Sequence, residues 1–250
     1  MTDDVQALAS PAIDIAGLSH RIGGRTVLED INLAVPAGRF VVLLGQNGAG
    51  KTTLFSLLTR LYAAQSGSIL IFGDDMRRHA SAALAKMGIV FQQRALDLEL
   101  TAAQNLAYHA ALHGLSQAVT RERITAELSR VGLLKEAGRR ARSFSGGEMR
   151  RIEIARALVH QPRLLLCDEA TVGLDIRSRA DILADVRSLV QDRGLTVFWA
   201  THLIDEVKPE DLTVVLHRGR ILHYGEAGAI VSGLGAGSLQ DAFRRLTNAA

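Results

Sequence analysis

Apolar positions along the chain form short runs that predict the strands of a sheet. The runs Phe40–Leu44, Arg163–Cys167 and Thr196–Ala200 are almost entirely hydrophobic, as expected of strands buried on both faces. Residues Val27–Val35 end in an alternation of apolar and polar side chains, which is typical of a half-buried strand. Further strands are predicted at Ile13–Leu18, Ser68–Phe72 and Gly88–Phe91, and at Val214–Leu216 and Ile221–Tyr224, which flank a hairpin turn.

Helical periodicity dominates the middle of the chain. Residues 147–160 place Ile152, Ala155, Leu158 and Val159 on one side, and Pro162 ends that segment. Other helices are predicted at 51–62, Thr101–His113, Thr120–Leu134, 178–192 and Ser238–Leu246, and the Gly-rich segment Gly225–Gly237 is predicted to be a loop. The pattern predicts one α/β domain over residues 1–250, with a core of about 1–92 and 161–250 and a helical insertion at about 93–160.

Composition narrows the class of protein. The chain has 250 residues, of which 48% are hydrophobic and 22% are charged, which is enough for a buried core. The formal net charge is only +3 and no block of Lys and Arg stands out, so no nucleic-acid partner is expected. The single cysteine, Cys167, excludes an internal disulfide, fits a reducing compartment and is expected to fill the core.

One segment is long enough to raise the question of a membrane span. No Asp, Glu, Lys or Arg occurs between Glu99 and Arg121, but residues such as Gln104, Asn105 and His109 make the segment too polar for a bilayer core. It is therefore expected to be an amphipathic helix that ends near Gly114. The first residues, 1–4, are acidic and do not resemble a signal peptide. We expect a chain that does not insert into a membrane itself.

A phosphate-binding loop lies between the predicted strand 40–44 and the predicted helix 51–62. Its residues fit the pattern G-x-x-x-x-G-K-[ST]: Gly45, Gln46, Asn47, Gly48, Ala49, Gly50, Lys51 and Thr52, followed by Thr53. Glycines let successive N–H groups point at phosphate oxygens, and the helix adds its positive end. Lys51 supplies a charge to the β- and γ-phosphates, and the Thr52 hydroxyl is suited to bind Mg²⁺. The alternative is a Gly-rich turn that only caps a helix.

Carboxylates follow a second buried strand. Asp168 and Glu169 directly follow the apolar run 163–167. Ligands of parallel sheets bind at the carboxyl ends of strands, which is where these two residues lie. Asp168 is suited to hold Mg²⁺ and Glu169 to orient or deprotonate an attacking water. Gln92 and His202 also follow strands, where each could sense a γ-phosphate. Ordinary solvated side chains at strand ends are the alternative for all four.

A second candidate anion site lies at the start of the predicted helix 147–160. Ser145, Gly146, Gly147 and Glu148 place a serine and two glycines at a helix N-terminus, where backbone N–H groups are free to bind an anion. A flexible helix cap would produce the same pattern. The argument for function comes from position, because Ser145 lies shortly before Asp168 in the chain.

Taken in order, these motifs resemble those of the ATP-binding-cassette ATPases over almost the whole chain, from about Ile13 to Tyr224. The series includes the phosphate loop, Gln92, residues 145–148, Asp168 with Glu169, Asp175 after Gly173 and Leu174, and His202. The resemblance implies a P-loop NTPase (RecA-like) α/β core with an antiparallel β subdomain and an inserted helical subdomain.

It also implies ATP and Mg²⁺ as cofactors and a head-to-tail dimer of two copies. Each ATP would lie between Lys51 of one copy and Ser145 and Gly147 of the other. In such a site Thr52 and Asp168 hold Mg²⁺ and Gln92 senses it. Glu169 is the catalytic base, and His202 contacts the γ-phosphate. Asp175 communicates across the dimer.

The chain departs from the usual pattern of this family at several positions. An aromatic residue that stacks on adenine is replaced by Ile22, and His20 is the nearest ring-bearing alternative, so the use of GTP stays open. Phe144 stands where Leu is usual, Glu148 where Gln is usual, and Ala170 where Pro is frequent. We expect these substitutions to have little effect on the catalysed reaction.

The resemblance further implies an ATPase that powers membrane transport through a separate transmembrane permease subunit. Residues 92–114 lie where the family docks that partner, although most of their apolar side chains must fill the core. The sequence from Gln104 to Leu115 is similar to the corresponding segment of bacterial exporter ATPases, and more narrowly to that of ATPases associated with pyrroloquinoline-quinone-dependent alcohol oxidation. The expected location is peripheral, at the cytoplasmic face of the inner membrane. Two alternatives stay open. One is a non-transport ATPase of the same fold, such as one for iron–sulfur assembly. The other is a GTP-binding switch, which is disfavoured because this chain has no Asn-Lys-x-Asp motif.

Overall fold

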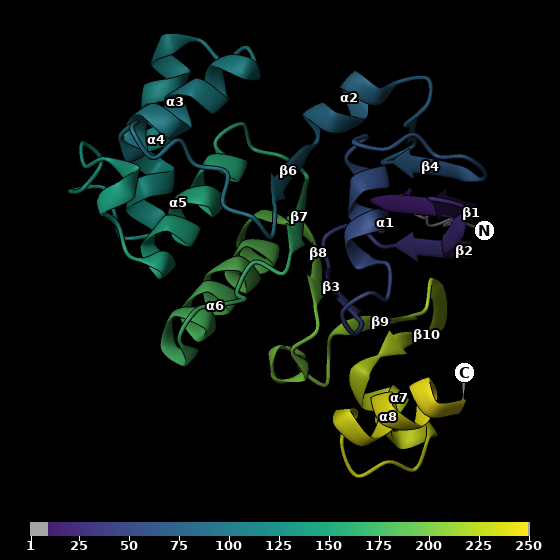
Figure 1. Cartoon of the computed structure of the whole chain (residues 1–250). Helices are drawn as coiled ribbons and strands as arrows, with labels where there is room; N and C mark the ends of the chain where they lie inside the picture. Colours follow the sequence, from purple (N-terminus) through teal and green to yellow (C-terminus); the bar gives the residue numbers. More distant parts are fainter. Residues whose placement is uncertain (1–9, 250) are drawn as a thin grey trace, which may run out of the picture.

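The computed structural model describes residues 10–249, which form a mixed α/β fold (Figure 1). The acidic residues 1–4 lie outside the described part. The strands are β1 (Ile13–Ile22), β2 (Arg25–Val35), β3 (Phe40–Leu44), β4 (Ser68–Ile71), β5 (Asp74–Asp75), β6 (Met87–Val90), β7 (Leu164–Asp168), β8 (Thr196–Thr201), β9 (Leu212–His217) and β10 (Arg220–Glu226). The helices are α1 (Lys51–Leu58), α2 (Ala80–Ala85), α3 (Ala102–Leu112), α4 (Gln117–Arg130), α5 (Gly146–Leu158), α6 (Ile176–Arg193), α7 (Ala227–Gly233) and α8 (Leu239–Ala249). Two short 3₁₀ turns, η1 (Ala141–Ser143) and η2 (Ile204–Glu206), complete the list.

The central sheet has six strands in the order β10-β9-β3-β8-β7-β6. The pairs from β9 to β6 are parallel, and β10 is added antiparallel at the edge. Every residue of β3, β7 and β8 is buried, as their continuous apolar runs predict. Because the carboxyl ends of these strands point the same way, the residues that follow them gather at one edge of the sheet.

Two hydrophobic clusters cover the two faces of this sheet. On one face, α1 and the antiparallel sheet β2-β1-β4-β5 pack together, with Phe55 stacked on Phe198 at 5.6 Å between ring centroids. On the other face, α5, α6, α7 and α8 contribute to a cluster that contains Trp199 and Cys167. Cys167 is fully buried, which agrees with its expected place in the core.

Helices α3, α4 and α5, which we call the helical lobe, have a hydrophobic cluster of their own at one end of the molecule (Figure 1). Two capping residues start its first two helices: Thr101 accepts a hydrogen bond from Gln104 N, and Ser116 accepts one from Val119 N. Among residues 10–249, no helix combines the length and hydrophobicity needed to span a bilayer.

Charged side chains join the helical lobe to α6. Arg130 of α4 pairs with Asp185 of α6, and Arg193 of α6 pairs with Glu127 of α4 at 2.7 Å. Glu127 is only 3% exposed, so its carboxylate depends on these arginines for compensation. These pairs connect the C-terminal end of α4 to α6 of the core.

The sequence interpretation was wrong or incomplete in several places: the helix predicted at Thr120–Leu134 lies at Gln117–Arg130, and the strand predicted from Ile13 to Leu18 continues to Ile22. The segment Gly225–Gly237, predicted to be a loop, contains α7, because Ala227 and Ile230 are buried against the core. Helix α1 ends at Leu58 rather than near Tyr62, and Arg60 then adopts a left-handed φ of 62°. The short elements β5 and α2 were not predicted, since neither has enough residues to show a period.

Candidate functional site

The phosphate loop connects β3 to α1 and needs its glycines for two different reasons. Gly50 has a φ of 110°, which side-chain-bearing residues rarely adopt, and it is the N-cap of α1. Gly45 has ordinary torsions, but a Cβ there would lie 2.7 Å from the carbonyl oxygen of Leu216 on β9. The loop is therefore held tightly against the neighbouring strand, with Gln46 and Asn47 exposed at its tip.

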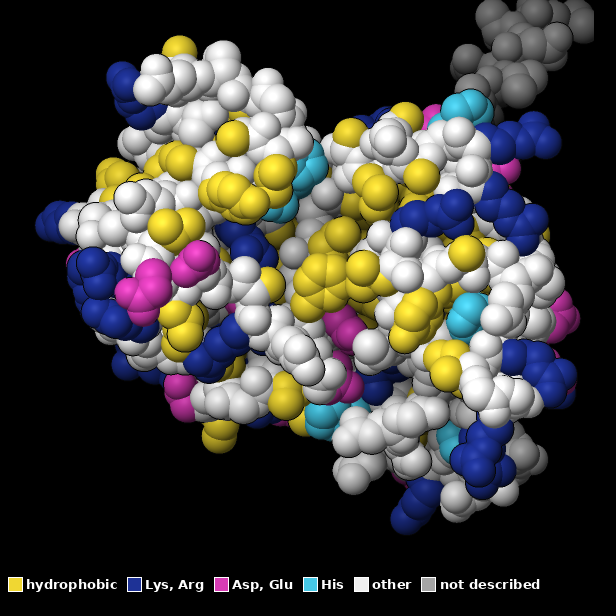
Figure 2. All heavy atoms as spheres, turned by 45° about the horizontal axis from the view of Figure 1, so that its top comes forward, with side chains coloured by type: hydrophobic (Ala, Val, Ile, Leu, Met, Phe, Trp, Pro, Cys, Tyr) yellow, Lys and Arg dark blue, Asp and Glu magenta, His cyan; other side chains and the backbone are white. Residues whose placement is uncertain are grey.

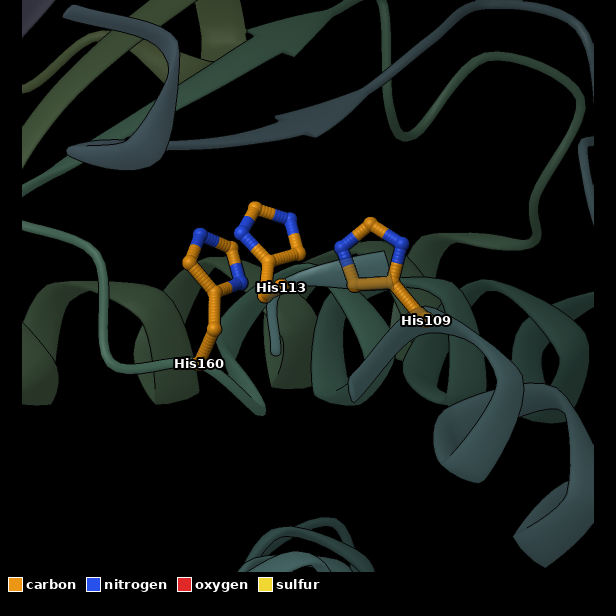
Figure 3. Close-up of side chains that lie close together, drawn as sticks. All are labelled: His109, His113 and His160. Carbon is orange, nitrogen blue, oxygen red and sulfur yellow. The ribbon is translucent and has the colours of Figure 1, made fainter. Parts of the chain in front are cut away.

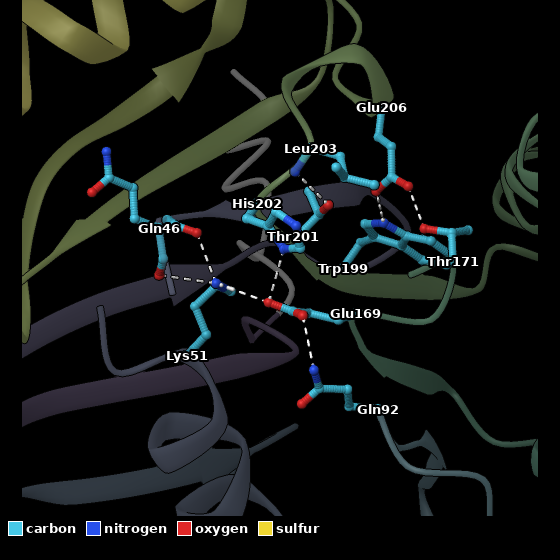
Figure 4. A network of polar contacts seen from close by, with 11 residues as sticks. Gln46, Lys51, Gln92, Glu169, Thr171, Trp199, Thr201, His202, Leu203 and Glu206 are labelled. Atoms are coloured by element: carbon cyan, nitrogen blue, oxygen red, sulfur yellow. Dashed lines mark hydrogen bonds and ion pairs between the residues drawn. The ribbon is translucent and has the colours of Figure 1, made fainter. Parts of the chain in front are cut away.

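Lys51 is folded into this loop and is only 4% exposed. Its Nζ donates to the carbonyl oxygens of Gly45, at 2.7 Å, and Gln46, at 3.2 Å (Figure 4). The same Nζ lies 3.1 Å from Oε1 of Glu169. Without a ligand, three oxygen atoms therefore hold the ammonium group inside the loop, where a phosphate would enter.

Glu169 is the centre of the predicted site. Its side chain is 6% exposed and its φ of 48° is left-handed, a strained conformation that is found preferentially at functional sites. Its Oε2 accepts from Gln92 Nε2 at 3.1 Å, and its Oε1 lies 3.2 Å from Nδ1 of His202. The structure thus brings together Lys51, Gln92, Glu169 and His202 from four separate segments, as the strand-end argument anticipates (Figure 4).

Asp168 fits the role of a metal-binding carboxylate. It is 2% exposed, and its Oδ1 has no hydrogen-bond partner among the described residues. Burial raises the pKa of the Asp168 carboxyl, the hydroxyl of Thr52 opposes that shift, and the charge of Glu169 adds to it. A cation such as Mg²⁺ would compensate the buried charge, and Thr52 supplies a hydroxyl oxygen beside it. The donor set of Thr52 and Asp168 therefore suits Mg²⁺.

A pocket of about 330 Å³ lies over the phosphate loop. Its lining consists of Val27, Asn47, Gly48, Gly50, Lys51, Thr52, Thr53, Gln92 and Glu169. All but Val27 were predicted from the sequence. Val27 lies on β2, and a short apolar side chain of this kind gives no signal in a sequence that would mark it as a ligand contact.

The segment 145–148 contributes no residue to the lining of this pocket. Ser145 caps α5 in a capping box: its Oγ accepts from Glu148 N at 3.3 Å, and Glu148 Oε2 accepts from Ser145 N at 2.8 Å. That backbone hydrogen bond lowers the pKa of the Glu148 carboxyl. A Cβ on Gly147 would lie 2.8 Å from Oγ of Ser178, which is itself bonded to Asp175 at 2.6 Å. The segment is thus packed beside Asp175, at the start of α6.

The two residues considered for contact with the nucleotide base, Ile22 and His20, have different surroundings. Ile22 is 44% exposed, so its side chain is available to a ligand. His20 is 6% exposed and its ring is stacked on Tyr62, with centroids 5.6 Å apart and planes inclined by 12°. The imidazole of His20 is therefore engaged in packing, and sequence reading had no signal for its contact with Tyr62.

The apolar residues of the segment 92–114 divide between core and surface. Leu96 and Leu106 are buried in the helical lobe, as expected, but Leu98, Tyr108 and Leu112 are 48%, 65% and 68% exposed. The last two line a groove of about 430 Å³. Figure 2 shows hydrophobic side chains gathered on this face of the helical lobe, beside the hollow that separates it from the core.

Comparison with known proteins gives consistent matches. A family model described as "ABC transporter" matches residues 28–172. The Nod factor export ATP-binding protein I of Rhizobium johnstonii is 36% identical over 226 residues, which cover 90% of this chain and 72% of the relative. The methionine import ATP-binding protein MetN 1 of Rhodococcus jostii is 36% identical over 242 residues, covering 92% and 72%. The solved structure of cbiO1 from Clostridium perfringens, part of the ABC transporter complex cbiONQ, has a TM-score of 0.81 and 28% identity, and the match covers 89% of this chain and 91% of that one.

Proposed function

The chain belongs to the ABC transporter family of ATP-binding proteins, and from that premise we propose that it is the exporter-type ATPase subunit of a transporter whose permease is a separate polypeptide. The observation that carries the proposal is the convergence of Lys51, Gln92 and His202 on the buried carboxylate of Glu169. ATP hydrolysis needs a charge at the phosphates and a base near the attacking water. This cluster contains a group suited to each task.

In the proposed site, the phosphate loop binds the β- and γ-phosphates through its N–H groups and Lys51. When a nucleotide binds, Lys51 exchanges its carbonyl partners for phosphate oxygens, which also changes its contact with Glu169. Thr52, Gln92 and Asp168 would hold Mg²⁺, which neutralises phosphate charge when bound. Glu169 then orients and deprotonates water, and His202, at the same carboxylate, contacts the γ-phosphate.

We further propose that two copies of the chain close head to tail around two ATP molecules. The support is that the segment 145–148 has a helix N-terminus with an exposed Ser145, yet it contributes no residue to the lining of the pocket of its own subunit. In a head-to-tail pair, this segment would complete the site of the partner. Such a contact makes hydrolysis depend on dimer closure.

The permease would dock on the exposed apolar side chains of Tyr108 and Leu112, which line one groove, and of Leu98. This would place the subunit at the cytoplasmic face of the membrane. Both exporters and importers occur among the relatives, so the direction of transport rests on the likeness of the segment 104–115 to exporters. The narrower link to pyrroloquinoline-quinone-dependent alcohol oxidation stays a prediction.

The direct test of transport is co-purification from detergent-solubilised membranes. We expect a stoichiometric multi-span membrane protein, and we expect Tyr108→Ala combined with Leu112→Ala to weaken its recovery. A control is Leu61→Ala, an exposed apolar side chain that follows α1. Recovery of the ATPase with soluble partners alone would contradict a transport role and favour the non-transport alternative.

A mixing experiment tests the shared site. We choose Ser145→Arg over a change at Gly147, because Gly147 has no room beside Ser178 in its own subunit and the side chain of Ser145 is exposed. The Lys51→Ala/Ser145→Arg double variant is mixed in equal amounts with the wild type. If sites are shared, mixed dimers have no intact site and activity falls to about a quarter of that of the same total amount of wild type, whereas sites within one subunit leave about a half.

A further inference from the structure

Three histidines lie together in a part of the fold that the proposed ATPase does not use. His109 and His113 are one helical turn apart at the end of α3, and His160 follows the end of α5. Each ring offers a nitrogen, and these three nitrogens lie within 4.8 Å of one another. Figure 3 shows the three rings gathered between the two helices and the edge of the sheet.

The ring nitrogens of this histidine cluster are not all used in packing. His160 Nε2 lies 3.0 Å from the carbonyl oxygen of Met87, to which it donates, so the lone pair of this ring is on Nδ1. Neither His160 Nδ1 nor His109 Nε2, both buried, has a hydrogen-bond partner in the part of the chain that the structure describes. An unpaired buried polar atom is costly, and the Nδ1 of His160 and the Nε2 of His109, in its Nδ1–H tautomer, would each be satisfied by a ligand that accepts a lone pair.

We propose that His109, His113 and His160 form a binding site for a divalent first-row transition metal ion of the type that imidazole prefers, such as Zn²⁺ or Ni²⁺. A pair of histidines at i and i+4 on a helix is a common metal-binding arrangement, and three imidazoles with one open position are a frequent zinc donor set. The hydrogen bond from His160 Nε2 to the carbonyl oxygen of Met87 is the kind of contact that orients a metal-bound histidine.

Binding requires a small rearrangement of the cluster. Nitrogen atoms around a tetrahedral Zn²⁺ are about 3.3 Å apart, so the present spacing must shrink. The rings of His113 and His160 are now stacked, with centroids 3.6 Å apart and planes inclined by 12°. Because the lone pair lies in the plane of each ring, these two rings must tilt before they can share an ion. All three side chains are half-buried, which leaves them room to turn.

The electrostatic surroundings both favour and oppose a cation. Burial lowers the pKa of His109 to about 3 and that of His160 to about 4, so both rings are neutral near pH 7 and their lone pairs are free. The guanidinium of Arg156, which also lowers the pKa of His109, opposes a second positive charge. Arg156 is held by the carbonyl oxygen of Ala95 at 2.6 Å. We therefore expect Arg156→Gln to strengthen metal binding.

The position of the site indicates what a bound ion would do. It would link the end of α3 to the residue after α5, and through Met87 to β6 of the central sheet. His109 also lines the groove that contains Tyr108 and Leu112, so a bound ion would lie beside that groove.

The test is a Zn²⁺ titration of the full chain, without an affinity tag or nucleotide, monitored by calorimetry. It is repeated with Co²⁺, whose binding is monitored by visible absorption. We expect one ion per chain and, at a Zn²⁺ concentration about a hundred times Kd, a Tm increase of about 5–10 °C. His109→Ala and His160→Ala should each weaken binding by at least about tenfold. The control His223→Ala, an exposed histidine on β10, should bind as the wild type does.

Two further measurements separate this site from other causes of binding. Asp168→Asn, in the nucleotide site, should leave the Zn²⁺ affinity unchanged, and X-ray absorption of the Zn²⁺-loaded wild type should show three imidazole ligands without the need for any variant. The proposal is overturned if the wild type binds no stoichiometric ion, if binding survives the triple histidine variant, or if it is lost only in Asp168→Asn. None of these readouts depends on ATP hydrolysis, so the outcome is independent of the proposed function.

Discussion

Replacement of Glu206 by Ala should destabilise the chain strongly, because this buried carboxylate joins three parts of the core. Glu206 lies in η2, is 3% exposed, and accepts hydrogen bonds from the indole Nε1 of Trp199, at 3.0 Å, and from the hydroxyl of Thr171 (Figure 4). Thr171 follows Glu169 by two residues, and Glu206 follows His202 by four. The carboxylate therefore connects the two chain segments that carry the proposed catalytic groups.

The size of the effect follows from the two donors that would be left behind. Trp199 is fully buried and Thr171 is 1% exposed, so neither can turn to water after Glu206→Ala. An unsatisfied buried donor costs about 1–3 kcal/mol, which gives about 2–6 kcal/mol for the pair. That is a large share of a typical free energy of unfolding of about 5–15 kcal/mol. Glu206→Gln keeps one acceptor oxygen and should lose only about half as much.

The assay is urea unfolding followed by fluorescence, because Trp199 is the single tryptophan of the chain and reports on this contact directly. Glu210→Ala, an exposed position four residues away, is the matched control. We expect Glu206→Ala to lower the midpoint well below that of the control and to reduce ATP turnover through a displaced His202. A free energy of unfolding within about 0.5 kcal/mol of that of the control would refute the reasoning.

Three more predictions follow from packing and burial. Gly88→Ala should prevent stable folding, since its Cβ would lie 2.3 Å from a backbone oxygen of α5, whereas Gly138→Ala, with open space around it, should keep the wild-type Tm in a thermal melt. Burial raises the pKa of the Cys167 thiol, so a thiol reagent at pH 8 should modify Cys167 only after unfolding, and rapid labelling of the native chain would contradict its place in the core. Ile22→Tyr should tighten ATP binding by at most ~1–3 kcal/mol, the value of one stacking contact, and equal affinities of the two proteins in a competition titration would show that Ile22 lies away from the base.

Several features were predictable because their cause is local in the sequence. Continuous apolar runs identify the fully buried strands, and their common direction in a parallel sheet explains why Gln92 and His202 reach Glu169. The phosphate loop is recognisable for the same reason, since its pattern fixes both ligand and backbone shape within one short segment.

Other features depend on contacts between distant residues and have no local signature. Helix α7 forms in a Gly-rich segment because Ala227 and Ile230 find the core, which a turn-forming composition hides. The histidine cluster unites His109 with His160, far apart in the chain, and only the packing of α3 against α5 brings them together. Glu206 shows no pattern that distinguishes it from a surface glutamate before its partners are known.

The central claim, that this chain hydrolyses ATP with Glu169 as the base, is tested most directly by Glu169→Gln. The amide keeps the shape of the side chain and one acceptor oxygen, which can stay with Lys51, but it cannot accept a proton. Single-turnover and steady-state hydrolysis should slow by about 10²–10⁴-fold, while ATP binding is retained and an ATP-bound dimer accumulates on a sizing column. Hydrolysis at the wild-type rate in Glu169→Gln would contradict the assignment of Glu169 as the base.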